Sequence, residues 1–246
     1  MRQFDHCGTS WLRGLVVAAI CSATLTSAAH AEPKTDAPAA AVKKKSTRTL
    51  GIVLYPAFEL LDVYGPAEVF GNIPGGLKVV MVAEKAGPVP SAQGPVSVAD
   101  FGFDDCPPLD LILVPGGMGT LAEVKNPKML QWLKTRANDA EIVMSVCSGS
   151  AILAEAGLLD GRKATSNKRY FQVAVDHGPK VEWVEKARWV DDGNRVTSSG
   201  VSAGIDMSLA VVGRLFGEKT AERIADLTEY QWHRDAANDP FYRPKQ

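Results

Sequence analysis

The sequence predicts an α/β fold: a doubly wound, mostly parallel sheet flanked by helices, of the flavodoxin-like sandwich type. Four runs with the character of buried strands span residues 49–55, 77–83, 109–114 and 141–146. These runs are continuously apolar rather than alternating, which is typical of parallel strands covered by helices on both faces. Helical stretches separate them, and this alternation favours a layered α/β architecture in a single domain.

The helices between these strands are predicted from their start and stop signals. One is expected over residues 65–70, because Pro66 suits the first turn of a helix. A second is expected over residues 127–133, with Asn126 as its N-cap. A third is expected over residues 151–156, directly before a glycine.

The C-terminal half continues the pattern with shorter elements. They are expected as a helix over about 168–176, a strand over 181–184, a hairpin turn at 191–194, a strand over 195–198, and helices over about 202–216 and 218–230.

The first 31 residues have the composition of a secretory signal peptide. Arg2 and Arg13 form a basic region, residues 14–28 are apolar and small, and an A-x-A cleavage site ends at Ala31. A transmembrane anchor is the disfavoured alternative, because the stretch is short and diluted by Ser and Thr. We therefore expect cleavage after Ala31, a periplasmic location, and no stable membrane association after the signal is removed.

The rest of the chain divides into a leader and a folded part. Residues 32–48 are rich in Ala, Pro and Lys, which predicts a flexible leader. Residues 49–246 form the expected α/β domain, and they carry 20 Lys and Arg against 25 Asp and Glu. This acidic balance argues against a nucleic-acid partner.

Cys147 stands where a predicted strand turns into a predicted helix. Apolar residues 141–146 precede it, and small residues 148–151 follow it. Such a turn lifts the sulfur clear of the sheet, as in the nucleophile elbow of hydrolases. Free N–H groups at the helix start favour thiolate, so we expect a nucleophile whose pKa lies below its usual value. A small core cysteine is the alternative.

Further candidates follow the first and third strands, at the sheet edge where ligands collect. Asp62 is expected to act as the acid beside the thiol, with helix capping as the alternative. For Glu59 two interpretations remain open: a residue of the site and a residue of the exposed surface. The N–H groups of Gly116, Gly117 and Ser148 are expected to form an oxyanion hole.

The remaining chemistry-bearing residues predict neither a disulfide nor a cofactor. Cys106 precedes one parallel strand whereas Cys147 follows the next, so both thiols are expected free; a disulfide needs Cα atoms within about 7 Å. His177 and His233 lack partners at metal-ligand spacing, so no metal is expected and structural roles are favoured. The glycine spacing matches no nucleotide-binding motif, and no cofactor is expected.

Four segments together resemble the ThiJ/PfpI superfamily, nearest its isonitrile hydratase-like branch: LLDVYGPAEVF, LDLILVPGGMG, IVMSVCSGSAILAEAGLLDGRKAT and VTSSGVSAGIDMSLAVV. The resemblance covers about residues 49–230 and implies the class I glutamine amidotransferase-like fold and a homodimer. It also implies Cys147 as the nucleophile, Asp62 as the acid, and Gly117 and Ser148 as backbone donors.

One departure from the resembled family bears on the chemistry. Relatives often have a histidine after the AGLLDGxxAT stretch, where this chain has Thr165, Ser166, Asn167 and Lys168. Without an imidazole to move protons, amidase or protease chemistry is disfavoured. The resemblance therefore implies a small-molecule substrate, best an isonitrile hydrated to an N-substituted formamide. Glyoxalase- or deglycase-like action on 2-oxoaldehydes and a non-enzymatic periplasmic redox-sensing or ligand-binding protein remain alternatives.

Overall fold

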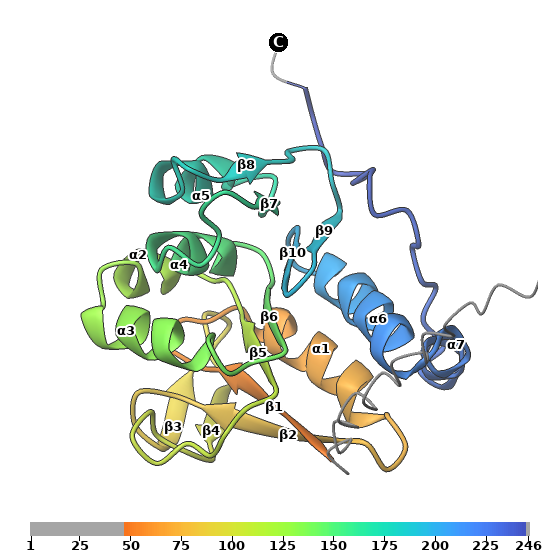
Figure 1. Ribbon diagram of the computed structural model, residues 1–246, viewed down its shortest axis with the longest axis horizontal. Helices are drawn as coiled ribbons and strands as arrows, with labels where there is room; N and C mark the ends of the chain where they lie inside the picture. Colours follow the sequence, from red (N-terminus) through yellow and green to blue (C-terminus); the bar gives the residue numbers. More distant parts are fainter. Residues whose placement is uncertain (1–46, 245–246) are drawn as a thin grey trace, which may run out of the picture. The chain divides into compact units, whose positions relative to one another are not determined.

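A computed structural model describes residues 47–244 (Figure 1). The expected signal peptide, residues 1–31, and residues 32–46 of the expected leader lie outside the described residues. The first strand begins at Arg48, one residue before its predicted start and inside the stretch assigned to the leader. Within residues 47–244, no helix combines the length and apolar character needed to cross a membrane.

Six strands form the central sheet, in the order β2-β1-β5-β6-β10-β9. All neighbouring pairs are parallel except β10 and β9, which form an antiparallel hairpin at one edge. The strands are β1 (Arg48–Val53), β2 (Leu77–Val82), β5 (Leu111–Val114), β6 (Ile142–Ser145), β9 (Trp189–Asp192) and β10 (Arg195–Ser198). The predicted fold class is confirmed.

Helices cover both faces of this sheet (Figure 1). Helix α1 (Leu60–Gly71) packs beside α6 (Ala203–Phe216), which also contacts α7 (Glu218–Leu227). The other helices are α2 (Thr120–Glu123), α3 (Pro127–Arg136), α4 (Gly149–Glu155) and α5 (Phe171–His177), and α4 contacts the other three. Every residue of β5 and β6 is buried, as the continuous apolar runs predict.

Helix α1 begins earlier than the sequence predicted, and Pro66 lies inside it rather than in its first turn. Proline removes one backbone hydrogen bond within a helix. The helix nevertheless buries Val63, Pro66, Val69 and Phe70, which recur at helical spacing, so packing outweighs that loss. The consequence for the site is that Asp62 lies in the first turn of α1 and is buried.

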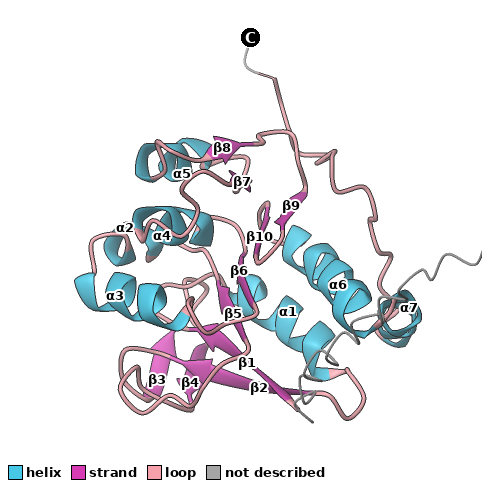
Figure 2. Ribbon diagram, viewed as in Figure 1, coloured by secondary structure: helices cyan, strands magenta, loops and turns pink. Residues whose placement is uncertain are grey.

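Several short elements were missed by the sequence reasoning. A hairpin of β3 (Gly87–Pro90) and β4 (Val96–Ala99) forms a separate two-stranded sheet, and β4 contacts β2 of the main sheet (Figure 2). Strand β7 (Lys163–Ala164) and the single-turn helix α2 were also missed, whereas β8 (Glu182–Trp183), which pairs with β7, lies within the strand predicted over residues 181–184. Each has too few residues for a hydrophobic period to show.

Candidate active site

Cys147 forms the turn between β6 and α4, and its backbone is left-handed, with φ of 59°. Such a conformation is unfavourable for a residue with a Cβ and needs support from its surroundings. The Cys147 N–H donates to the carbonyl of Ser199 at 3.1 Å. Its carbonyl accepts from the hydroxyls of Ser150 and Ser166, both at 3.1 Å. Three hydrogen bonds thus hold the elbow in place.

Two glycines let the elbow approach β5. A Cβ on Gly149 would lie 2.3 Å from the carbonyl oxygen of Val114, so the start of α4 needs a glycine there. A Cβ on Gly116 would lie 2.6 Å from the nitrogen of Ser148. These close approaches bring the loop after β5 against the turn that carries the sulfur.

The sulfur of Cys147 accepts a hydrogen bond from the side-chain amide of Asn167, with 3.1 Å between Nδ2 and Sγ. The backbone and the hydroxyl of Ser148 also lie close enough to the sulfur to favour its ionised form and so to lower the pKa of Cys147. Sequence reasoning missed Asn167. The available signal was that it lies in the segment where the resemblance led us to look for a histidine.

The prediction of a lowered pKa for Cys147 was wrong. Only 6% of the residue is exposed, and burial raises the pKa of the thiol above its ordinary value. The charge of the Asp62 carboxylate raises it further, whereas donors from Ser148 and Asn167 offset only part of the shift. In the structure, desolvation outweighs the helix-start effect on which the prediction rested. The resting form of Cys147 is therefore the thiol.

Asp62 is completely buried, and its Oδ2 accepts the backbone N–H of Gly116 at 2.8 Å. Burial raises the pKa of this carboxyl well above its ordinary value, and the neighbouring Glu59 raises it further. The Cys147 thiol is close enough to lower that pKa by hydrogen bonding, although no hydrogen bond of standard geometry reaches Oδ1. The N-cap of α1 is Glu59, so Asp62 is not a helix cap.

The three expected backbone donors have different surroundings. The N–H of Gly116 is already used by Asp62, so its expected place in an oxyanion hole is wrong in this structure. The N–H of Gly117 donates to the Ser148 hydroxyl across 3.2 Å, which is a long hydrogen bond. Gly117 and Ser148 both line the cavity beside the sulfur, whereas Gly116 holds Asp62 in place.

A chain of hydroxyl groups runs away from the site. The Ser148 hydroxyl lies 2.9 Å from that of Thr120, which lies 3.2 Å from the phenol of Tyr55. The Tyr55 hydroxyl donates to the carbonyl of Pro115 at 2.6 Å. Burial raises the pKa of Tyr55 well above its ordinary value, so this phenol stays protonated. The chain fixes the Ser148 side chain beside the thiol.

A cavity of about 240 Å³ opens onto the Cys147 sulfur. Its lining is Glu59, Gly117, Met118, Thr120, Leu121, Cys147, Ser148, Asn167, Tyr170, Val173 and Val201. Glu59 is its one charged side chain and is held by the amide of Gln93 at 2.8 Å. Within the described residues, no group of His, Cys, Asp and Glu could hold a metal ion. The cavity suits a compact, largely apolar molecule.

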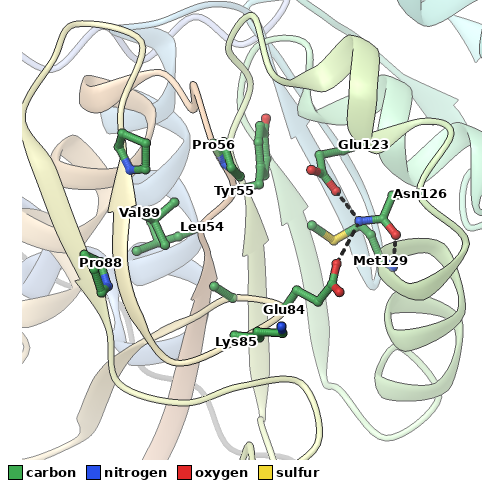
Figure 3. Close-up of a pocket in the computed structure, with 12 residues that line it drawn as sticks. Leu54, Tyr55, Pro56, Glu84, Lys85, Pro88, Val89, Glu123, Asn126 and Met129 are labelled. Atoms are coloured by element: carbon green, nitrogen blue, oxygen red, sulfur yellow. Dashed lines mark hydrogen bonds between the residues drawn. The ribbon is translucent and has the colours of Figure 1, made fainter.

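A second cavity of about 240 Å³ is lined by Tyr55 together with Glu84, Glu123 and Asn126, among other residues (Figure 3). Its polar groups are mutually engaged: the Asn126 amide donates to Glu123 at 2.9 Å and to Glu84 at 3.2 Å. The Asn126 carbonyl accepts the N–H groups of Lys128 and Met129, as its predicted N-cap role requires. We interpret this cluster as the cap of α3, outside the Cys147 site.

The other candidate residues lie outside the Cys147 cavity. Both described cysteines are free, which confirms that prediction, and the Cys106 thiol donates to the carbonyl of Pro107 at 3.4 Å. His177 lies 2.6 Å from the Glu155 carboxylate, and the backbone N–H of His233 donates to a buried aspartate. Neither histidine lines the cavity beside Cys147.

Known proteins resemble this arrangement along most of the chain. The DJ-1/PfpI family model matches residues 48–214. The chain is 36% identical to the isonitrile hydratase of Pseudomonas putida over 74% of this chain and 78% of that protein. It is 30% identical to the HTH-type transcriptional regulator CdhR of Pseudomonas aeruginosa over 59% of this chain but only 43% of the regulator. A solved ThiJ/PfpI family protein from Pseudomonas syringae aligns with a TM-score of 0.68 at 34% identity, covering 87% of this chain and 85% of that one.

Proposed function

Because the chain belongs to the DJ-1/PfpI family, we propose that it is a cysteine-dependent enzyme that hydrates an isonitrile to an N-substituted formamide. One observation carries the proposal: a buried thiol, that of Cys147, lines a largely apolar cavity, and the buried carboxyl of Asp62 lies against it, so that each raises or lowers the pKa of the other. Such a pair offers a nucleophile and a proton together.

The terminal carbon of an isonitrile can accept both the nucleophile and the proton. Asp62 gives its proton to that carbon while the Cys147 sulfur forms a bond to the same carbon, and the thiol proton passes to Asp62. The product is a thioimidate, R–N=CH–S–Cys, and no group leaves. Protonation by a carboxyl of raised pKa is general acid catalysis, which contributes about 10²- to 10⁴-fold.

Water then completes the reaction. It adds to the thioimidate carbon, and one of its protons goes to nitrogen, giving R–NH–CH(OH)–S–Cys. When the carbon–sulfur bond breaks, the hydroxyl proton returns to the thiol and R–NH–CHO is released. Gly117 and Ser148 line the cavity, and the N–H of Gly117 makes only a long hydrogen bond of 3.2 Å to the Ser148 hydroxyl, so we assign the N–H groups of these two residues as donors to the oxygen. The reaction needs no imidazole, because no amine has to be expelled.

A panel assay tests the proposal. The purified chain is incubated separately with an alkyl isonitrile, with methylglyoxal and with an N-alkyl amide, and products are followed by mass spectrometry. Formamide formed from the isonitrile, lost in Cys147→Ala and kept in Cys106→Ala, is the expected result. Turnover of methylglyoxal with no turnover of the isonitrile would replace this proposal with the glyoxalase- or deglycase-like alternative.

A non-enzymatic ligand-binding or redox-sensing protein is the second candidate. Its support is the similarity to a transcriptional regulator, together with a resting thiol that is poorly ionised. Calorimetry with an isonitrile distinguishes the two functions. Saturable binding with no formamide after prolonged incubation would favour this second candidate.

We also propose that the protein is exported to the periplasm and works as a homodimer. Exposed apolar side chains on α1 and β4 support the dimer: Leu61, Tyr64, Val96 and Val98. The Tyr64 hydroxyl bonds that of Ser97 at 2.8 Å, so the two elements share one surface. Sedimentation should give a dimer that Val98→Glu dissociates and Leu227→Glu, on exposed α7 surface, does not. Cell fractionation with N-terminal sequencing from Glu32 tests export.

A further inference from the structure

The orientation of the Asn167 amide is fixed by the backbone around it. Asn167 lies in the loop between β7 and α5, and its Oδ1 accepts the N–H of Arg169 at 2.9 Å and of Tyr170 at 3.0 Å. With the carbonyl end used in this way, the NH₂ end must face the other direction. It faces Cys147, with 3.1 Å between Nδ2 and Sγ.

A donor aimed at this sulfur acts on the ionised form of the thiol. A hydrogen bond to a charged group is worth more than one to a neutral group, so the amide favours the thiolate over the thiol. It opposes burial and the Asp62 charge, which both raise the pKa of Cys147. A carboxamide is not a base, so Asn167 holds the sulfur without removing its proton.

Gly200 provides the space that this amide occupies. A Cβ at Gly200 would lie 2.0 Å from Nδ2 of Asn167 and 3.3 Å from Sγ of Cys147. The backbone of Gly200 is outside the left-handed region, so its conformation does not require glycine. The reason for a glycine there is the room that it leaves between the two side chains.

We propose that Asn167 is a positioning residue for Cys147, seated against Gly200: its amide holds the sulfur and stabilises the thiolate as it forms. This role rests on the proposed function only in that Cys147 is the nucleophile. The test therefore measures the reactivity of the thiol itself, so that a failure of isonitrile turnover and a failure of this proposal are distinguishable.

The test is alkylation of the full chain by iodoacetamide at pH 8 to 9, followed by mass spectrometry of the Cys147 peptide. The Cys106 peptide of the same sample is the internal reference. Loss of one donor should reduce the thiolate fraction about ten- to a hundredfold, and the greater nucleophilicity of a more basic sulfur offsets part of that loss. The rate for Asn167→Ala should therefore fall about three- to tenfold.

A second substitution covers the case in which Asn167→Ala disturbs the loop. Asn167→Asp retains an oxygen that can accept the N–H groups of Arg169 and Tyr170, but it presents no donor to the sulfur. The rate should fall at least as far as with alanine, because the new carboxylate also repels the thiolate. The matched control is Asn138→Asp, on an exposed residue, which should alkylate like the parent.

A double-mutant cycle tests whether Gly200 provides the space for the Asn167 amide. Gly200→Ala should push the amide off the sulfur and slow alkylation of the parent, yet it should have no further effect when Asn167 is already alanine. The pH at which the alkylation rate rises should move upward in both single variants. Unchanged rates and pH profiles in the Asn167 variants, or additive effects of the two substitutions, would overturn the proposal.

Discussion

Cys106 and Cys147 are both buried free cysteines, and they differ in the direction of the hydrogen bonds at the sulfur. The Cys106 thiol donates to a carbonyl, that of Pro107, an interaction that only the protonated form can make. The sulfur of Cys147 instead accepts from Asn167, and both Ser148 and the Asp62 carboxyl lie close enough to change its pKa. Burial raises the pKa of both thiols.

The difference shows that burial alone does not distinguish Cys106 from Cys147, the nucleophile of the proposed function. At Cys106 the hydrogen bond at the sulfur stabilises the thiol, and the charge of Arg136 offsets only part of the effect of burial. At Cys147 the cost of desolvation is opposed by donors that stabilise the thiolate more than the thiol, and in the proposed mechanism Asp62 exchanges that proton with a substrate. The comparison between the two sites can be tested one property at a time.

The largest expected effect is on turnover. Cys147→Ala should abolish formamide production while the circular dichroism and the melting temperature stay near those of the parent, because the substitution removes the one thiol among the residues that line the cavity. Cys106→Ala should leave turnover near the parent value. Equal loss of turnover in both variants would remove the distinction between the two sites.

The second effect concerns the proton donor. Asp62→Asn should lower the maximal rate about 10²- to 10⁴-fold, the range of general acid–base catalysis. At a pH where the carboxyl of the parent is ionised, the same variant should alkylate faster at Cys147, because the carboxylate charge that raises the pKa of the thiol is gone. Slower turnover together with a more reactive thiol would show that Asp62 contributes by donating a proton and not by making Cys147 a stronger nucleophile.

The matched control for this change is Glu59→Gln. Glu59 lines the same cavity and raises the pKa of Asp62, but it holds no proton for the reaction in the proposed mechanism. Its loss should change the rate less than about tenfold. An Asp62→Asn enzyme with the parent rate and pH profile would show that the carboxyl has no part in proton transfer.

The sequence predicted the sheet and the placement of the elbow because both depend on local pattern. The apolar run 141–146 and the small residues after Cys147 specify a buried strand and a close turn whatever the rest of the chain does. Asp62 was predicted in the same way, from its place after the first strand, although the start of its helix was misplaced.

The electrostatics of the site could not be predicted in this way. The pKa of Cys147 depends on desolvation by atoms from many helices and strands. These atoms come from segments far apart in the chain, so no short stretch of sequence reveals their combined effect. Asn167 reaches the sulfur from a loop 20 residues away, and the use of the Gly116 N–H by Asp62 joins residues 54 apart. Residue type and spacing indicate candidates, whereas partners are decided by tertiary packing.

A third, smaller effect is the pH dependence of stability. The folded state holds the Asp62 proton to a higher pH than the unfolded chain, so folding loses stability as the pH rises from about 4 through the folded-state pKa. The slope is at most about 1.4 kcal/mol per pH unit. The unfolding free energy of Asp62→Asn relative to the parent should therefore increase between pH 4 and pH 8 in urea titrations.

The control for this measurement is Cys147→Ala, which keeps the carboxyl and its burial. Burial is the first cause of the shift, so this variant should lose stability with pH as the parent does. If the parent and Asp62→Asn instead respond to pH in parallel, Asp62 ionises in the folded protein as it does in the unfolded chain.

The smallest effect compares the two backbones. Cys147 has a φ of 59°, whereas Cys106 is not among the described residues with positive φ. Left-handed backbone costs a residue with a Cβ about 1–2 kcal/mol, and glycine avoids that cost. Glycine also has a more flexible unfolded chain, which costs about 0.5–1 kcal/mol relative to alanine. At position 147 the cost of the left-handed backbone exceeds the cost of the more flexible unfolded chain. At position 106 only the cost of the unfolded chain applies.

Glycine and alanine should therefore rank in opposite orders at the two positions. Cys147→Gly should unfold at higher urea than Cys147→Ala, by roughly 0.5–1 kcal/mol in free energy. Cys106→Gly should be less stable than Cys106→Ala by a similar amount. Both pairs remove the same sulfur, so packing losses cancel within each pair and the difference isolates the backbone. The same ranking at both positions would mean that the backbone of Cys147 is not strained. Its three hydrogen bonds would then not be holding an unfavourable conformation in place.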